Sequence, residues 1–251
     1  MAPAIVFQLL AVLFFLLFAA FLMATHNSGF FSTPQSPETV SGYDRVAWCY
    51  DVLAGLVFGP ALRNAQRAAL TGLPAGTPHL LILGGGTGWV LLEVLSRRPG
   101  ATVLYLEASP RMLARTRRRL ARECPAALPQ VEFRHGTQDA LLPTEQFDAL
   151  ITFFVLDCIA LPEIAEALAR LRAAMRPGAP WLLADFRPAR RGWRWLLLAT
   201  MYAFFRLTTG LRARELPRLR PALARLGLRP GSRQFFFGGA IEAIIFRAET
   251  H

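Results

Sequence analysis

The 251-residue chain contains no lysine, so its 28 basic side chains are all arginine, and arginine alone accounts for the formal net charge of +11. A Walker P-loop requires a Gly-Lys-Ser/Thr element, and the absence of lysine excludes it. Alanine, leucine, arginine, glycine and proline are abundant instead. This composition indicates a bias toward arginine, and part of the positive charge follows from that bias without a function of its own.

Cysteine is scarce, and nucleic-acid-binding motifs are missing. Cys49, Cys124 and Cys158 are far apart and form no C-x-x-C pair, which excludes a metal-ligand pattern and a disulfide framework. We therefore expect no metal, and reduced or buried thiols in a cytosolic setting. No zinc-finger or RNA-recognition motif accompanies the charge, so nucleic acid is an unlikely partner and an anionic membrane surface is favoured.

The glycines gather at one point, and the chain is organised around it. An apolar strand at 80–83 leads into Gly84, Gly85, Gly86 and Gly88, and a helix is expected over 87–97. A strand that turns through glycines into a helix brings backbone N–H groups to one place, which suits a polar, partly anionic ligand. The dinucleotide fingerprint G-x-G-x-x-G fails, because Trp89 stands where its third glycine belongs.

The G-x-G-x-G that remains is followed by a strand over 102–106 that ends at Glu107. An acid at the tip of this strand can accept hydrogen bonds from both ribose hydroxyls of a nucleoside. Together with the helix that opens Tyr43-Asp44-Arg45-Val46, this arrangement resembles the class I S-adenosylmethionine-dependent methyltransferases of the ubiquinone-biosynthesis type. The resemblance implies S-adenosylmethionine as cofactor. It also implies a Rossmann-like, three-layer α/β sandwich with a mostly parallel seven-stranded sheet whose last strand is antiparallel.

The resemblance also implies the other residues of the site. Tyr50 lies in the helix over 43–58 that covers the cofactor in this family, although an aromatic at that spacing also suits a core. The loop after the strand 131–134 meets the adenine ring, with Asp139 or the backbone of Gln138 as alternatives. Thr137 holds the place where the family often has an acid, and Ile82 replaces another acid two positions before Gly84.

Residues 147–157 are expected to form a fourth strand and its exit, with the exit at 152–157. In the family that this chain resembles, residues at this exit line the methionyl end of the cofactor and the acceptor pocket. We single out Phe153, Phe154 and Asp157 there, with a helix N-cap as the alternative for Asp157. A strand over 181–186 places Asp185 at its carboxyl tip. If the acceptor is a hydroxyl or an acidic carbon, Asp157 or Asp185 is the catalytic base.

Residues 4–24 are uncharged, and their 21 residues are enough to cross a bilayer. We expect a transmembrane anchor at 1–24, a linker at 25–42 and a methyltransferase domain at 43–251. A cleaved signal is the alternative for the anchor, although no basic n-region precedes it. The arginines that follow the segment place the domain on the cytoplasmic side.

The rest of the domain is expected to continue the alternation of helices and strands. Helices are predicted over 109–123 and 161–175, the first with an arginine-rich face that is either solvated or a binding patch. Residues 187–232 are predicted to be a lid or insertion that contains a short apolar helix at 196–205. Two strands, expected over 232–237 and 240–246, flank Gly238-Gly239 and form a terminal hairpin.

The expected function is methyl transfer to a small-molecule or lipid-like acceptor. A non-catalytic nucleoside-binding protein with the same fold is one alternative, and a nucleotide-dependent oxidoreductase is another. The sequence does not choose among a quinone, a phospholipid, a phenol or a protein side chain as acceptor, and it gives no oligomeric state.

Overall fold

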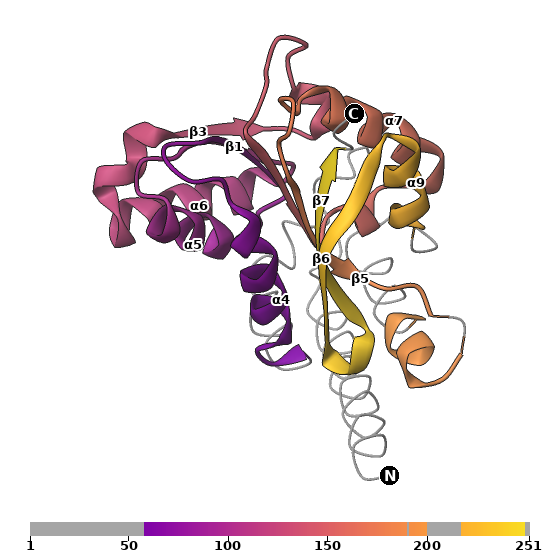
Figure 1. Ribbon diagram of the computed structural model, residues 1–251. Coiled ribbons are helices and arrows are strands. Elements are labelled where there is room, and N and C mark those ends of the chain that lie inside the picture. The colour runs from indigo at the N-terminus through magenta and orange to yellow at the C-terminus, as the bar shows by residue number, and fades with distance from the viewer. Residues whose placement is uncertain (1–57, 190, 200–216, 249–251) are drawn as a thin grey trace, which may run out of the picture.

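The computed structural model describes residues 58–189, 191–199 and 217–248 (Figure 1). The predicted anchor at 1–24, the linker at 25–42, Tyr50 and nearly all of the helix predicted over 43–58 lie outside these ranges. Within the described ranges, no helix has the length and apolar character needed to cross a membrane.

A seven-stranded sheet in the order β3-β2-β1-β4-β5-β7-β6 forms the middle of the molecule. Its strands are β1 (His79–Leu83), β2 (Thr102–Glu107), β3 (Val131–His135), β4 (Ala149–Phe153), β5 (Trp181–Phe186), β6 (Leu228–Phe236) and β7 (Ile241–Ala248). The first five strands pair in parallel, and β7 runs antiparallel to both of its neighbours, β5 and β6. This confirms the prediction of a mostly parallel sheet with an antiparallel last strand.

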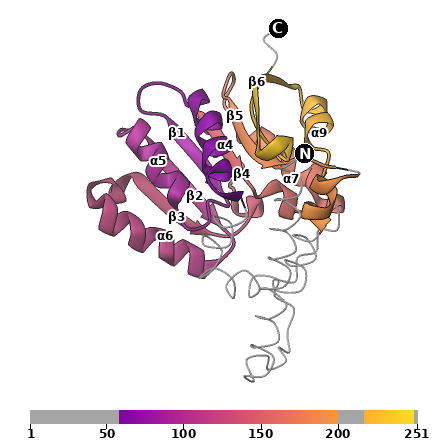
Figure 2. The ribbon, with the colours of Figure 1, turned by 90° about the horizontal axis from the view of Figure 1, so that it is seen from below.

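Helices cover both faces of the sheet, as a parallel sheet requires (Figures 1 and 2). They are α4 (Ala61–Ala69), α5 (Trp89–Arg97), α6 (Pro110–Glu123), α7 (Leu161–Ala173) and α9 (Leu219–Arg225). Alternate side chains of β1 enter opposite cores: Ile82 packs in the core that α4, α5 and α6 share, and Leu81 packs in the core that α7 and α9 share. The predicted three-layer sandwich is therefore confirmed.

The structure corrects several predicted bounds. The helix after the glycine loop begins at Trp89 rather than 87, because Gly88 has a left-handed conformation with φ +85°. The fourth strand ends at Phe153, and its exit turns into a short 3-10 helix, Leu156–Cys158.

The terminal hairpin begins earlier than predicted, at Leu228 rather than 232. A proline followed by a glycine, here Pro230 and Gly231, is typical of the end of a strand. Strand β6 nevertheless passes through both residues, with an irregularity between Pro230 and Arg233. A proline is tolerated there because β6 is the edge strand, where a missing N–H leaves no ladder partner unsatisfied. The predicted lid segment 187–232 therefore already contains α9 and the start of β6; its residues 200–216 lie outside the described ranges.

The topology fixes where a ligand fits. In the sheet, β1 lies between β2 and β4, so the strand order reverses at β1. Open α/β sheets bind ligands at such a switch point, beyond the carboxyl ends of the strands. The glycine loop, Glu107 and the exit of β4 all leave the sheet at this edge.

Candidate functional site

The glycine loop between β1 and α5 is crowded at Gly84 and Gly88 and open at Gly86. Gly84, Gly86 and Gly88 have φ values of +65°, +61° and +85°, which non-glycine residues rarely adopt. A Cβ on Gly84 would lie 2.8 Å from Cβ of Val155, and one on Gly88 would lie 2.6 Å from Cγ2 of Thr116. A Cβ on Gly86 would meet nothing within 4 Å. The open side at Gly86 therefore offers space for a ligand to approach the backbone.

The peptide groups of Gly86 are held from both sides. Its carbonyl accepts hydrogen bonds from the hydroxyls of Tyr105, at 3.1 Å, and Thr116, at 2.8 Å, while its N–H donates to Oε2 of Glu107 at 2.9 Å. Burial, and secondarily the charge of Glu107, raises the pKa of the Tyr105 hydroxyl, so it stays a donor. Neither Tyr105 nor Thr116 was predicted as a site residue, because a tyrosine inside an apolar strand is typical of a core residue.

Glu107 ends β2 beside the loop, as predicted, and is buried. Its Oε1 accepts from the N–H of Ser109 at 3.0 Å, and its Oε2 accepts from Gly86. Burial raises the pKa of Glu107, and these two N–H groups offset only part of that effect. Each carboxylate oxygen carries more than one acceptor site, so the group can still accept hydroxyl donors from a ligand.

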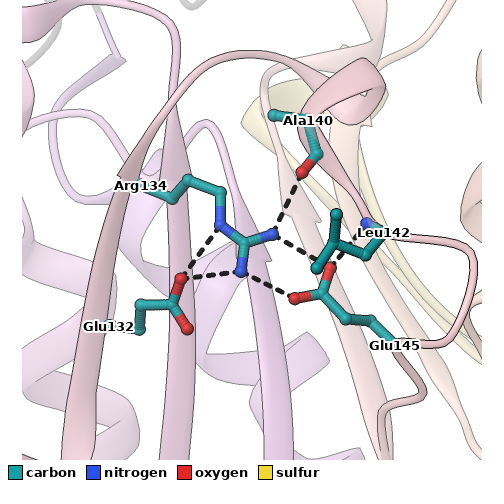
Figure 3. Close-up of polar contacts among 5 residues, drawn as sticks. All are labelled: Glu132, Arg134, Ala140, Leu142 and Glu145. Carbon is teal, nitrogen blue, oxygen red and sulfur yellow. Dashed lines mark hydrogen bonds and ion pairs between the residues drawn. The ribbon is translucent and has the colours of Figure 1, made fainter.

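Arg134 on β3 fastens the loop that follows its own strand (Figure 3). Its guanidinium donates to both oxygens of Glu145, at 2.6 and 2.9 Å, to Oε1 of Glu132, at 2.6 and 2.9 Å, and to the carbonyl of Ala140 at 3.0 Å. Oε2 of Glu145 also accepts from the N–H of Leu142 at 2.8 Å. The hydrogen bonds from Arg134 lower the pKa of Glu145 despite its partial burial.

The loop that Arg134 holds contains the residues predicted to meet the adenine. Gln138 and Asp139 lie in a 3-10 turn, Gln138–Ala140. The carboxylate of Asp139 is exposed, pairs with Arg170 of α7 at 3.4 Å and accepts from the Thr137 hydroxyl at 3.2 Å. The acid therefore already has partners on its α7 side, and the adenine contact of Gln138 or Asp139 stays a prediction.

Replacing Arg134 by methionine should loosen this loop. Hydrogen bonds to charged partners stabilise by about 1.5–3 kcal/mol, so we expect the free energy of unfolding to fall by about 2 kcal/mol and the affinity for a nucleoside ligand to fall several-fold. Denaturant unfolding and calorimetric titration measure both. The matched control is Arg122→Met on α6, whose exposed ion pair with Glu123 should contribute little. Equal effects of both substitutions would contradict the role of Arg134.

An aromatic cluster lies at the exit of β4. Phe154 has φ +53°, an uncommon conformation for a bulky residue, and its N–H donates to the carbonyl of Ala184 at 2.8 Å. The ring centroids of Phe154 and Phe58 each lie 5.2 Å from that of Phe186, and Phe58 lies 5.3 Å from Phe237. Phe153, one residue earlier, is buried in the core. A cofactor contact by Phe153 remains a prediction.

Two predicted catalytic acids lie close together at the ends of β4 and β5. Both Asp157 and Asp185 are buried. Oδ1 of Asp185 accepts from the N–H of Phe186 at 2.8 Å, whereas its Oδ2 is buried without a hydrogen-bond partner. Burial raises the pKa of Asp185 well above its usual range, and the nearby charge of Asp157 raises it further. Oδ1 of Asp157 accepts from the Cys158 thiol at 3.4 Å.

The alternative interpretation of Asp157 as a helix cap is wrong, since the N-cap of α7 is Ala160. Ile82, which stands where the family often has an acid, is fully enclosed in β1. In the ranges that the structure describes, no group of three or more His, Cys, Asp or Glu side chains could hold a metal ion.

Comparison with known proteins agrees with this geometry. Residues 81–180 match the family described as a methyltransferase domain. The chain is 31% identical over 147 residues to the ubiquinone/menaquinone biosynthesis C-methyltransferase UbiE of Paracoccus denitrificans, a match that covers 57% of each protein. It is 32% identical over 154 residues to the demethylmenaquinone methyltransferase of Thermus thermophilus, covering 60% of this chain and 66% of that protein. The match thus spans less than two thirds of the length of either relative.

Among solved structures, the N-methyltransferase NodS of Bradyrhizobium japonicum in complex with S-adenosyl-L-homocysteine has a similar fold. The TM-score is 0.63 at 16% identity, over 85% of this chain and all of that one. The fold, the glycine loop and the family match together define a class I methyltransferase domain. Over 147 to 154 residues the chain is similar to methyltransferases that use S-adenosylmethionine, as its resemblance implies, and its residues 81–180 match a methyltransferase domain.

Proposed function

We propose that this protein transfers a methyl group from S-adenosylmethionine to a small-molecule or lipid-like acceptor. One observation carries the proposal. The buried carboxylate of Glu107 is fixed by N–H groups of Gly86 and Ser109, beside a backbone where a Cβ on Gly86 would project into open space. This cradle fits a nucleoside: Glu107 would hold the ribose hydroxyls, and the loop backbone would lie against the amino-acid portion of the cofactor. When bound, S-adenosylmethionine supplies the electrophilic methyl group.

The acids at the ends of β4 and β5 are proposed to handle the proton that a hydroxyl or acidic carbon must lose. Burial raises the pKa of Asp185 well above its usual range, so this carboxyl holds a proton more tightly than an exposed aspartate does. We assign the accepting role to Asp157, which the Cys158 thiol supports by a hydrogen bond. Asp185, by keeping its proton, would leave the pair of Asp157 and Asp185 with no more than one negative charge.

An apolar ring system supports the choice of acceptor. The cluster of Phe58, Phe154, Phe186 and Phe237 at the exit of β4 suits an aromatic or isoprenoid molecule. One relative is named as a C-methyltransferase of ubiquinone/menaquinone biosynthesis, and the other as a demethylmenaquinone methyltransferase. We therefore propose a quinol-like acceptor as the first to assay. A membrane anchor at 1–24, with the domain on the cytoplasmic side, would bring the site close to such a molecule.

Two neighbouring glycines give the sharpest test of the cradle. A Cβ at Gly85 would lie 2.6 Å from Cζ of the fully buried Tyr105, so Gly85→Ala should lose both stability and cofactor binding. Gly86→Ala should remain folded at a cost of about 1–2 kcal/mol for its left-handed conformation, yet lose most of its affinity because its methyl group occupies the ligand's space.

Calorimetric titration of the detergent-solubilised full chain with S-adenosylmethionine and S-adenosylhomocysteine measures binding, and thermal unfolding reports the fold. Unchanged binding in a folded Gly86→Ala variant would contradict the cradle. Absence of binding in the folded parent protein would refute the methyltransferase proposal. Binding without transfer of labelled methyl to quinol acceptors or membrane extract would favour the non-catalytic nucleoside-binding alternative.

A further inference from the structure

Exposed aromatic side chains and exposed or half-buried arginines gather where the segment after β5 meets the β6–β7 turn. We call this surface the rim, with members Arg187, Arg191, Arg194, Trp195, Arg233 and Phe235. Trp195 is 51% exposed and Phe235 50%, and Leu196 next to Trp195 is 41% exposed. Large apolar side chains that stay exposed on one surface indicate an interaction site.

The rim is held together by contacts between its two segments, which lie next to each other at the lower end of the molecule in Figure 1. Arg187 and Arg194 both donate to the carbonyl of Gly239, at 3.0 and 3.3 Å. The ring of Trp193 lies 6.0 Å from that of Phe237 in the turn. The exposed side chains therefore project from a fixed surface.

Its charge is almost entirely positive. Residues 187–199 and 228–239 contain no acid. The guanidinium groups of Arg187 and Arg233 lie 4.5 and 4.4 Å from the ring centroid of Phe235. The carboxylate that faces them, Glu242, is mostly covered by its ion pairs with Arg233, at 2.7 Å, and Arg187, at 3.6 Å. An approaching surface therefore meets exposed aromatic rings flanked by cations.

We propose that the rim docks on the surface of an anionic phospholipid bilayer. Tryptophan and arginine favour the headgroup region, where the ring and the methylene stem meet apolar chains and the polar tips meet headgroups and water. Anionic headgroups complement the excess of arginine, and each arginine near such a surface strengthens binding roughly fivefold.

The position of the rim gives docking a consequence, which rests on the proposed function. Phe237 belongs to both the turn under the rim and the aromatic cluster, which continues through Phe58 and Phe186 to Phe154. Val155, the next residue, fills the space at Gly84 of the glycine loop. This row of packed rings connects the turn under the rim with the edge of the cofactor site, so docking at the rim would bring a lipid-like acceptor to the side of the molecule where that site lies.

Fluorescence quenching tests docking in the full chain reconstituted into vesicles. The lipids are phosphatidylcholine alone or an equal mixture with phosphatidylserine, each with bromine on the acyl chains. In the mixed vesicles we expect part of the tryptophan fluorescence to be quenched. The Trp195→Phe substitution should remove this quenched component, and high salt should restore its full emission. Subtracting the Trp195→Phe signal isolates the rim, even if residues 4–24 keep the chain at the membrane.

Two double variants separate the rim from charge in general. Arg191→Gln with Arg194→Gln should shift the docking equilibrium roughly 30-fold toward the undocked state. Arg117→Gln with Arg118→Gln removes the same charge from exposed positions of α6 and should leave Trp195 quenched. The proposal would be overturned if both double variants lost the quenching of Trp195 equally, or if Trp195 stayed unquenched in the mixed vesicles. It would also be overturned if Trp195 were quenched equally in phosphatidylcholine alone, or if self-association of the protein buried Trp195. No cofactor is present, so a failure of S-adenosylmethionine binding leaves this result unaffected.

Discussion

Replacing Glu107 by glutamine should weaken binding of S-adenosylmethionine by at least roughly 100-fold, although the side chain keeps its shape. The carboxylate accepts from two backbone N–H groups, of Gly86 and Ser109, one on each oxygen. A glutamine amide has only one acceptor oxygen, so its NH2 group must face one of these donors. Hydrogen bonds to a charged acceptor contribute about 1.5–3 kcal/mol each. The loss of such bonds from the ribose hydroxyls, together with the distortion of the Gly86 peptide, accounts for the expected loss of affinity.

The matched control is Glu166→Gln, an exposed acid on α7 whose only described partner is Arg170. We expect the cofactor affinity of this variant to match the parent protein in the same calorimetric titration. Glu107→Ala should bind no better than Glu107→Gln, because it leaves both N–H groups unsatisfied. If Glu107→Gln folds and binds within a factor of about three of the parent, less than 1 kcal/mol, Glu107 is not a cofactor ligand.

The pH dependence of binding provides a second readout for the same residue. Burial raises the pKa of Glu107 above its usual 4.5. The ionised form accepts ribose hydroxyls most strongly, so affinity should fall as the pH falls through that raised pKa. The Glu107→Gln variant cannot titrate at this position, and its weak affinity should lack this acid limb.

Much of the site was predictable because it is local in sequence. Left-handed conformations occur at Gly84, Gly86 and Gly88, and the pattern of strand, glycines and helix within about ten residues indicates them. Glu107 follows from the next strand, because parallel strands bring their carboxyl ends to one edge. The same regularity gives the sheet, since apolar runs of five or six residues alternate with helical patterns.

What escaped prediction depends on contacts between distant segments. Tyr105 and Thr116 hold the Gly86 carbonyl from β2 and α6, and nothing in their local sequence distinguishes them from core residues. The rim is similar, because its arginines and rings come from two segments about forty residues apart. The start of β6 was missed for another reason: Pro230 breaks most strands, and only the sheet order shows that it stands at an edge.

Removing the titratable group at Asp185 should change how stability depends on pH. The raised pKa means that folded Asp185 keeps a proton at pH values where the unfolded chain has lost it. Stability therefore falls as the pH rises from the ordinary value of 3.8 toward the raised pKa, by up to about 1.4 kcal/mol per pH unit. Asp185→Asn keeps an acceptor for the Phe186 N–H and cannot ionise. Its stability relative to the parent should increase steadily with pH over that window, measured by denaturant unfolding between acid and mildly alkaline pH.

Asp148 offers a control with the opposite sign. Burial alone would raise its pKa, but the N–H of His79, at 2.8 Å, and Arg176, at 2.7 Å, outweigh burial and lower it. The stability that Asp148 contributes is present above its ordinary pKa and is lost as the pH falls. Asp148→Asn should therefore be less stable than the parent at neutral pH, with a difference that shrinks on acidification. A parallel pH course for the two variants would show that Asp185 is ionised in the folded protein, which would make it, rather than Asp157 alone, available to accept a proton from the methyl acceptor.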